Sequence, residues 1–206
     1  MSKKLIISFE GIEGSGKSFH LKNVAVFLKK NKIPFVSLRE PGGSKNSEKI
    51  RKLILSNKST FNKKTDLLLY LAARSENIDN IIKKNYKKKT ILLDRFTDST
   101  IAYQHYGMNL DKKIIQTINN YLLKKIKINF TFLHIVNEKN LKLRLGKRRI
   151  LNRYDRFNLT FYRRVQNGFI KQSKMTKRKY LIINSNKKIY ENKNIIIKKF
   201  QKLLNI

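Results

Sequence analysis

The sequence predicts an α/β protein in which helices cover both faces of a parallel sheet. Short apolar runs of strand length alternate with longer amphipathic segments along the 206 residues, and this alternation is typical of a parallel sheet with helical crossovers. A glycine-rich loop also joins the first expected strand to the first expected helix, the context in which such loops bind phosphate. We therefore expect a single domain over residues 1–206, with ligands at the carboxyl ends of the strands.

The elements expected in the first half of the chain each have a local signal. The continuous apolar run at 5–9 predicts a buried strand, and apolar residues at helical spacing predict a helix over 19–30. A second apolar run at 33–38 predicts a strand, which ends in a loop rich in proline and glycine. Helices are expected over 44–55 and 65–84, each opened by a serine or threonine, which are good capping residues.

The second half continues the alternation. An apolar run at 90–93 predicts a strand, followed by helices over 97–106 and 111–124. A further strand is expected at 130–136, followed by a helix over 138–145. The chain closes with an expected helix over 159–174, a strand over 180–183 and a helix over 186–204. Charged residues follow the first three strands, so we expect them to converge at one edge of the sheet.

The composition is strongly basic, with 48 Lys and Arg against 13 Asp and Glu and a formal charge of +35. A nucleic-acid surface is one interpretation. The lysines are scattered rather than confined to one stripe, which favours a general composition bias and makes a nucleic-acid partner unlikely. Cysteine is absent, which excludes disulfides, zinc–thiolate sites and thiol catalysis. No apolar stretch approaches membrane-span length, so we expect a cytoplasmic protein without a membrane partner.

The glycine-rich loop fits the pattern G-x-x-x-x-G-K-[ST] at every fixed position. Glycines let backbone N–H groups converge on an anion, and the N-terminus of the following helix adds positive potential. Its lysine can reach the outer phosphates of a nucleotide, and its serine can ligate Mg²⁺. A glycine-rich turn without a ligand is the alternative. The expected ATP-binding residues are Gly11, Ile12, Glu13, Gly14, Ser15, Gly16, Lys17 and Ser18.

A P-loop by itself does not distinguish a GTPase, an ATPase and a kinase. A guanine-binding N-K-x-D motif would be expected after a late strand, but the segment 137–140 reads N-E-K-N and lacks the aspartate. A large motor ATPase would need a longer chain. Phosphoryl transfer between small molecules therefore fits the chain best, with a second phosphorylated substrate facing the first.

Five segments carry a resemblance to the thymidylate kinase family, in the bacterial type that uses a lid arginine. They are FEGIEGSGKS at 9–18, REPGG at 39–43, LYLAAR at 69–74, DRFTDSTIAYQ at 94–104 and the segment 153–165. The resemblance implies the P-loop nucleoside monophosphate kinase fold, with a five-stranded parallel sheet and a short lid at about 147–157. It also implies transfer of a phosphoryl group from ATP to dTMP with Mg²⁺, and a homodimer.

The resemblance assigns roles at the two phosphates. Lys17 and the loop backbone hold ATP, while Ser18 binds Mg²⁺ with Asp94 near the water shell of the metal. Arg95 follows a strand end, where its planar guanidinium can bind the dTMP phosphate. An ion pair between Arg95 and Asp94 or a neighbouring acid is the alternative. Arg51 is also assigned to the monophosphate, with a solvated helix face as an equal alternative.

The nucleoside requires an apolar surface and hydrogen-bond donors. Tyr70 and Arg74 are four residues apart and share one helix face, so Tyr70 can stack on thymine while Arg74 donates to a ring carbonyl. An ordinary core position is the alternative for Tyr70. Thr100 and Gln104 are placed to complete the base pocket, and the family places Tyr103 against the 2′ carbon of the sugar. The expected dTMP-binding residues are Glu13, Glu40, Arg51, Tyr70, Arg74, Arg95, Ser99, Thr100, Tyr103 and Gln104.

The P-loop offers Glu13 and no arginine, so charge at the transferred phosphoryl group must come from elsewhere. Glu13 is assigned to the neighbourhood of the 3′-hydroxyl, with stabilisation of the helix dipole as the alternative. Arg148 and Arg153 in the lid align with family arginines. The expected catalytic residues are Lys17, Asp94, Arg95, Arg148 and Arg153. A solvated basic loop is the alternative for the lid.

Three rival functions stay open from the sequence. A nucleoside monophosphate kinase with a different base preference is the nearest, although Tyr70, Arg74 and Gln104 favour thymine. A nucleic-acid-stimulated P-loop ATPase would use the basic charge instead. A degenerate regulatory binder is disfavoured because Lys17, Arg95 and Arg74 are all present.

Overall fold

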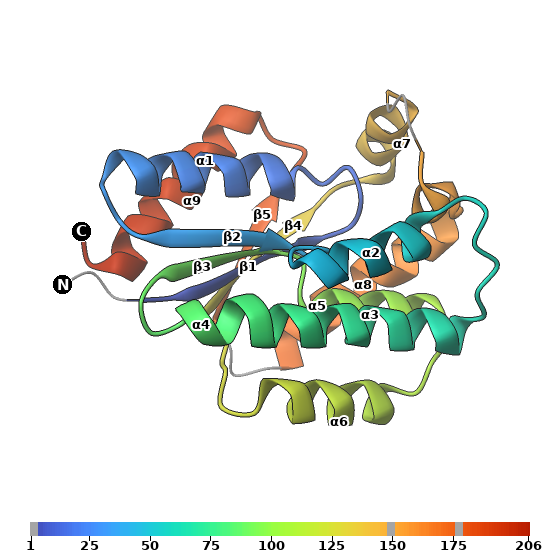
Figure 1. Cartoon of the computed structure of the whole chain (residues 1–206). Helices are drawn as coiled ribbons and strands as arrows, with labels where there is room; N and C mark the ends of the chain where they lie inside the picture. Colours follow the sequence, from blue (N-terminus) through green and yellow to red (C-terminus); the bar gives the residue numbers. More distant parts are fainter. Residues whose placement is uncertain (1–3, 148–150, 176–178) are drawn as a thin grey trace.

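Among residues 4–147, 151–175 and 179–206, which the computed structural model describes, five strands form one sheet (Figure 1). They are β1 (Ile6–Gly11), β2 (Phe35–Arg39), β3 (Thr90–Asp94), β4 (Phe130–Ile135) and β5 (Lys179–Asn184). Their order is β2-β3-β1-β4-β5 and every pairing is parallel. The predicted α/β class with a five-stranded parallel sheet is confirmed.

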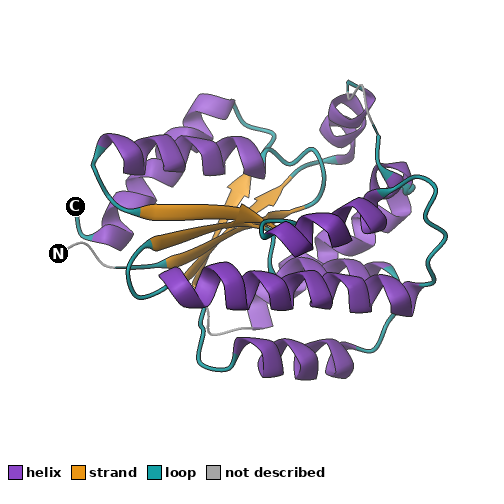
Figure 2. Ribbon diagram, viewed as in Figure 1, coloured by secondary structure: helices purple, strands orange, loops and turns teal. Residues whose placement is uncertain are grey.

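Helices cover both faces of this sheet, as Figure 2 shows. One face carries α1 (Lys17–Lys30) and α9 (Ile189–Leu204). The other side carries α2 (Lys45–Leu55), α3 (Lys63–Asn77), α4 (Lys83–Asn85), α5 (Thr97–Thr100), α6 (Lys112–Leu123) and α8 (Leu159–Met175). Helix α7 (Glu138–Gly146) stands beyond the end of β4. Among the described residues, none of these helices is both long and apolar enough to cross a membrane.

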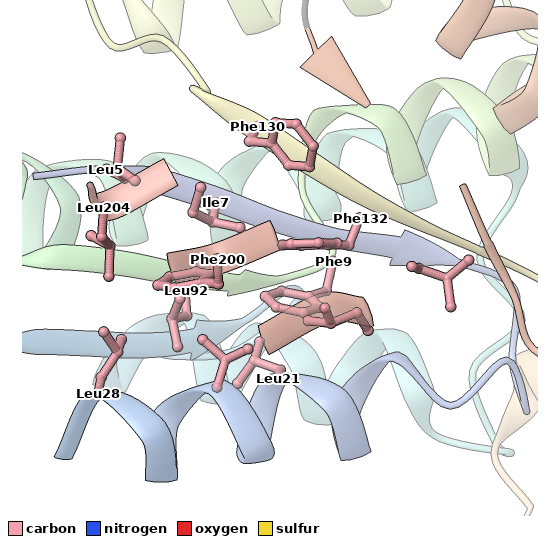
Figure 3. Close-up of a cluster of buried hydrophobic side chains, with 13 residues drawn as sticks. Leu5, Ile7, Phe9, Leu21, Leu28, Leu92, Phe130, Phe132, Phe200 and Leu204 are labelled. Atoms are coloured by element: carbon pink, nitrogen blue, oxygen red, sulfur yellow. The ribbon is translucent and has the colours of Figure 1, made fainter. Parts of the chain in front are cut away.

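The central strand β1 is buried on both faces, and its side chains alternate between two apolar clusters. Ile7 and Phe9 face α1 and α9, where Phe132 stacks on Phe9 with ring centroids 5.2 Å apart (Figure 3). Ile6 points to the opposite face and packs in a separate cluster with Ile91. This alternation is the period of two that a strand imposes on its side chains. It fixes the register of β1 and so the position of the loop that follows it.

Two differences from the predicted boundaries affect the site. Helix α1 begins at Lys17, two residues earlier than predicted, so the lysine and serine of the P-loop lie in its first turn. Helix α3 continues as the π-helical turn η1 (Ile78–Ile82), and α5 continues as the π-helical turn η2 (Ile101–Gly107). A π turn widens the helix and often occurs at functional sites, and η2 carries the predicted Tyr103 and Gln104.

Candidate active site

The P-loop connects β1 to α1, and two of its glycines are required by the backbone. A Cβ on Gly11 would lie 2.4 Å from the carbonyl oxygen of His134 on the neighbouring strand. Gly16 directly precedes α1 with a φ of 84°, in the left-handed region that favours glycine. These two positions let the loop turn tightly around a space at the helix N-terminus, where an anion is favoured.

Residues of the first turn of α1 meet the end of β3. Lys17 is buried, and its Nζ donates to the carbonyl oxygen of Ile12 at 3.3 Å. The Ser18 hydroxyl donates to the carboxylate of Asp94, so the two predicted metal ligands come together from separate elements. Oxygen donors of this kind suit Mg²⁺, which usually keeps several waters and binds through one or two protein groups and substrate phosphates. The residues present therefore fit a Mg²⁺ ion bound with ATP.

Arg95 links the end of β3 to the P-loop. Its backbone lies in the left-handed region with a φ of 72°, which is unusual for a residue with a side chain. Its guanidinium holds that conformation through two contacts of 2.7 Å, to the carbonyl oxygen of Gly11 and to the carboxylate of Glu13. The ion-pair alternative for Arg95 is thus present, with Glu13 rather than Asp94 as the partner. The second oxygen of Glu13 accepts a hydrogen bond from the Tyr103 hydroxyl.

The electrostatic balance around Glu13 follows from these contacts. Burial alone would raise the pKa of the Glu13 carboxyl, but Arg95, Lys17 and the Tyr103 hydroxyl outweigh it and leave the pKa lowered. For Arg95, burial lowers the pKa of the guanidinium, but the surrounding groups, Glu13 first among them, together raise it by more. Both groups are therefore charged at neutral pH, and the cation lies within the cavity described below.

The predicted base-binding arginine is enclosed by hydrogen-bond acceptors. Arg74 is 1% exposed, and its Nε and Nη2 lie 2.8 and 2.7 Å from Glu40 Oε2. Its Nη1 donates to Asn119 Oδ1 at 2.7 Å. Burial raises the pKa of the Glu40 carboxyl although Arg74 acts against it. Arg74 is therefore held rigidly by Glu40 and Asn119 on the wall of the cavity.

Side chains from α3 and η2 form the remaining wall. Tyr70 is half-buried, and its ring meets Tyr154 edge-on with centroids 5.8 Å apart. Gln104 is 1% exposed, and its Nε2 has no hydrogen-bond partner among the described residues. A buried amide donor without a partner is costly unless a ligand satisfies it. Gln104 therefore offers a donor to whatever fills the cavity.

These groups surround one cavity of about 360 Å³, a size that suits a small-molecule ligand. The predicted residues that line it are Glu13, Lys17, Ser18, Glu40, Arg51, Tyr70, Arg74, Asp94, Arg95, Ser99, Thr100, Tyr103 and Gln104. Arg51 is fixed there by a 2.5 Å hydrogen bond from its Nη1 to the carbonyl oxygen of Pro41. The other predicted P-loop residues, which were expected to act through the loop backbone, do not line the cavity. They are Gly11, Ile12, Gly14, Ser15 and Gly16.

The structure describes one of the two predicted lid arginines. Arg148 lies outside the described residues. Arg153 opens the short 3-10 helix η3 (Arg153–Arg156), and its Nη2 lies 2.5 Å from Asp66 Oδ1. Arg153 does not line the cavity, whereas its neighbour Tyr154 does. Asn152 caps η3 through a hydrogen bond from the Tyr154 backbone N–H.

Several residues of the site were not predicted. Tyr154 contacts the predicted Tyr70 and Tyr103 from η3, and Asn119 contacts Arg74 from α6. Tyr154 lies in a segment that resembles the family but was assigned no role, and no local pattern marks Asn119. Arg144 donates to the carbonyl oxygen of Gly14 at 2.8 Å and to that of Ser185 at 2.7 Å, which ties α7 to the P-loop. In the sequence, Arg144 could have been singled out because it lies about one helical turn before the basic stretch expected to form the lid. Lys22 and Arg39 add further positive charge to the cavity.

The fold and the site define a class of protein. The five-stranded parallel sheet, the P-loop and the cavity beside it, which several basic side chains line, are those of a P-loop nucleoside monophosphate kinase. Within this class, the family model of thymidylate kinase matches residues 9–196. The chain therefore belongs to the thymidylate kinase family.

Individual relatives agree with this assignment. The chain is 39% identical over 189 residues to a thymidylate kinase of Acholeplasma laidlawii, covering 90% of this chain and 92% of that protein. It is 36% identical over 186 residues to a thymidylate kinase of Thermosipho africanus, with 90% and 92% covered. The crystal structure of thymidylate kinase from Ehrlichia chaffeensis is similar with a TM-score of 0.75 and 29% identity, and the match covers 98% of each chain.

Proposed function

We propose that the chain transfers the γ-phosphoryl group of ATP to dTMP, giving dTDP and ADP. This is the reaction of the family to which the chain belongs. The observation that carries the proposal is the single cavity that joins Lys17 and Ser18 of the P-loop to Arg95, Arg74 and Tyr70. One cavity with both sets of groups can hold a donor and an acceptor phosphate facing each other, which is the main requirement of phosphoryl transfer.

The donor side consists of the P-loop and the end of β3. Backbone N–H groups of residues 14–18 bind the β- and γ-phosphates, and Lys17 balances their charge. Ser18 with Asp94 would hold a Mg²⁺ ion bound with ATP, and the metal would supply positive charge against the charge that develops on the phosphates. The contact between Ser18 and Asp94 supports this arrangement.

The acceptor side places the dTMP phosphate near Arg95 and Arg51 and the base between Tyr70 and η2. Arg74 donates to a thymine carbonyl, and the unpartnered amide of Gln104 provides a second donor. This donor pattern opposes the amino group of cytosine, because a donor facing a donor leaves both unsatisfied. Glu13 and Tyr103 contact the sugar in this proposal, which the hydrogen bond between their side chains on the cavity wall supports. Charge at the transferred phosphoryl group would come from the lid, where Arg148 and Arg153 were the predicted residues. Because Arg153 pairs with Asp66 and does not line the cavity, Arg148 is the residue that we propose for this role.

We also propose that the chain is a single kinase domain that acts in the cytoplasm, where ATP is supplied, and that it forms a homodimer. Exposed apolar side chains on α2, α3 and α6 support a self-association face. They include Leu53 at 52%, Leu68 at 59% and Ile114 at 53% exposure. Sedimentation of the wild type against Leu68→Asp tests this face, and a wild-type monomer at micromolar concentration would refute the dimer.

Product analysis tests the reaction itself. The purified protein is incubated with ATP, Mg²⁺ and dTMP, and nucleotides are separated by ion-exchange chromatography. We expect one dTDP for each ADP, and loss of both products when a chelator removes Mg²⁺. ADP without dTDP would show an ATPase and would overturn the proposal.

A further inference from the structure

Asp66 contacts two consecutive residues of the lid from the first turn of α3. Its side chain is 5% exposed, and its Oδ1 accepts a hydrogen bond from Arg153 Nη2 at 2.5 Å. Its Oδ2 accepts from the Tyr154 hydroxyl at 3.2 Å. One buried carboxylate therefore uses both oxygens to hold the short helix η3 against α3.

Tyr154 carries this contact to the substrate cavity. It is 3% exposed and lines the cavity. Its ring centroid lies 5.8 Å from that of Tyr70 and 6.1 Å from that of Tyr103. Asp66 and Tyr70 are four residues apart on α3 and so share one helix face. The same face of α3 thus supplies the base-stacking side chain and the carboxylate that fixes its aromatic neighbour.

The charge of Arg153 is directed to Asp66 rather than to the cavity. The guanidinium carbon lies 5.3 Å from the centroid of the Tyr154 ring, so Arg153 packs on the aromatic face while it pairs with the carboxylate. Breaking a buried pair by removing one partner leaves the other charge uncompensated. Asp66 and Arg153 are therefore expected to act as one unit.

We propose that Asp66 is a positioning residue, which acts through Arg153 and Tyr154 to anchor the lid segment 152–156 on the nucleoside side of the site. Arg153 serves as the partner of this anchor, and Tyr154 closes the wall of the dTMP pocket next to Tyr70. The kinetic consequence rests on the proposed kinase function, whereas the anchoring itself does not. Release of the anchor loosens the lid segment and weakens dTMP binding more than ATP binding.

The test compares Asp66→Asn with Asp79→Asn as a matched control. Asp79 on η1 forms an exposed i,i+4 ion pair with Lys83, the first residue of α4, outside the cavity. Its substitution therefore removes the same charge without affecting the lid segment. For Asp66→Asn we expect about a tenfold rise in KM for dTMP with KM for ATP changed by less than about twofold, the effect of losing one charge-assisted hydrogen bond. Amide hydrogen exchange of segment 152–157 in the ligand-free protein should also become faster.

A double-mutant cycle separates anchoring from a general structural effect. If Asp66 acts through Arg153, then the double variant Asp66→Asn/Arg153→Gln has a KM for dTMP no higher than that of the single variant with the larger effect. Additive losses, or an Asp66→Asn variant that matches Asp79→Asn in both exchange and KM, would overturn the proposal. If Asp66→Asn does not fold, Tyr154→Phe removes only the hydroxyl contact, and unchanged exchange in that variant overturns it instead. A wild-type protein that makes no dTDP refutes the kinase function, and the exchange result still decides the anchor.

Discussion

Arg95 Nη2 lies 2.7 Å from Glu13 Oε1, and this ion pair joins the end of β3 to the P-loop. Both side chains are largely buried, at 15% and 13% exposure. A guanidinium held this way is positioned before any substrate arrives, at the place where we propose that the donor and acceptor phosphates meet. Positioning of charge in advance is the main contribution a protein makes to phosphoryl transfer.

Arg95→Lys tests that geometry. An ammonium group keeps the charge but loses the planar fork that binds Gly11, Glu13 and a phosphate together. We expect kcat/KM for dTMP to fall roughly 10²-fold, the loss of one or two charge-assisted hydrogen bonds in the transition state. Arg163→Lys is the matched control, because Arg163 forms an exposed pair with Glu138 at 2.7 Å away from the cavity. Equal kinetics for the two variants would contradict the role of Arg95.

Lys17→Ala tests the P-loop. The ammonium of Lys17 is buried beside the loop backbone, where water cannot replace its charge. Turnover should drop by on the order of 10³-fold or more, with the melting temperature close to wild type. Lys29→Ala removes a lysine from the exposed end of the same helix and should retain full turnover. A fully active Lys17→Ala protein would show that the loop does not bind the transferred phosphate.

Arg74→Ala should lower the free energy of unfolding. It leaves the Glu40 carboxylate buried without its cationic partner, which costs about 3–5 kcal/mol of unfolding free energy. Asn119→Ala keeps that pair and removes one hydrogen bond, with a cost of about 1–3 kcal/mol. Urea denaturation of both variants measures the difference. If Asn119→Ala is as destabilising as Arg74→Ala, then the Glu40 pair is not the dominant interaction.

The sequence predicted the elements of the fold because its signals are local. Apolar runs at 5–9 and 90–93 and the glycines of the P-loop each identify their own element without the rest of the chain. The same holds for Arg95 and Arg74, which lie in motifs specific to one family. The contacts between distant segments were not predictable in this way. Asn119 reaches Arg74 across 45 positions, and Asp66 reaches Arg153 across 87, and neither contact leaves a pattern in a single sequence.

His134 provides a prediction on pH. It lies on β4 beneath the P-loop with its ring stacked on His20, centroids 5.4 Å apart, and neither ring nitrogen of His134 has a partner among the described residues. Burial, with smaller effects from the charges of His20 and Lys17, lowers the pKa of His134 from 6.5 to about 3. Between these values the unfolded chain binds a proton that the folded chain does not.

Stability should therefore fall as pH drops from about 6.5 towards 3. At pH 5 the contribution of His134 to this loss is about 2 kcal/mol. Urea denaturation at pH 8 and pH 5 of the wild type and of His134→Phe measures it, with His105→Phe as a control for a less buried imidazole. The wild type should lose more stability than His134→Phe over this interval, and identical losses would show that His134 does not titrate as described.

The substrate preference distinguishes a dTMP kinase from a kinase with another base preference and from a nucleic-acid-stimulated ATPase. Initial rates of ADP formation are measured with dTMP, dCMP, dGMP and AMP, and with single-stranded DNA or RNA in place of a monophosphate. We expect kcat/KM for dTMP to exceed that for each other monophosphate by roughly a hundredfold or more, because the proposed contacts of Arg74 and Gln104 with the base are both donors. Nucleic acid should leave the basal rate unchanged. Equal turnover of all four monophosphates, or ATP hydrolysis that only nucleic acid stimulates, would contradict the account.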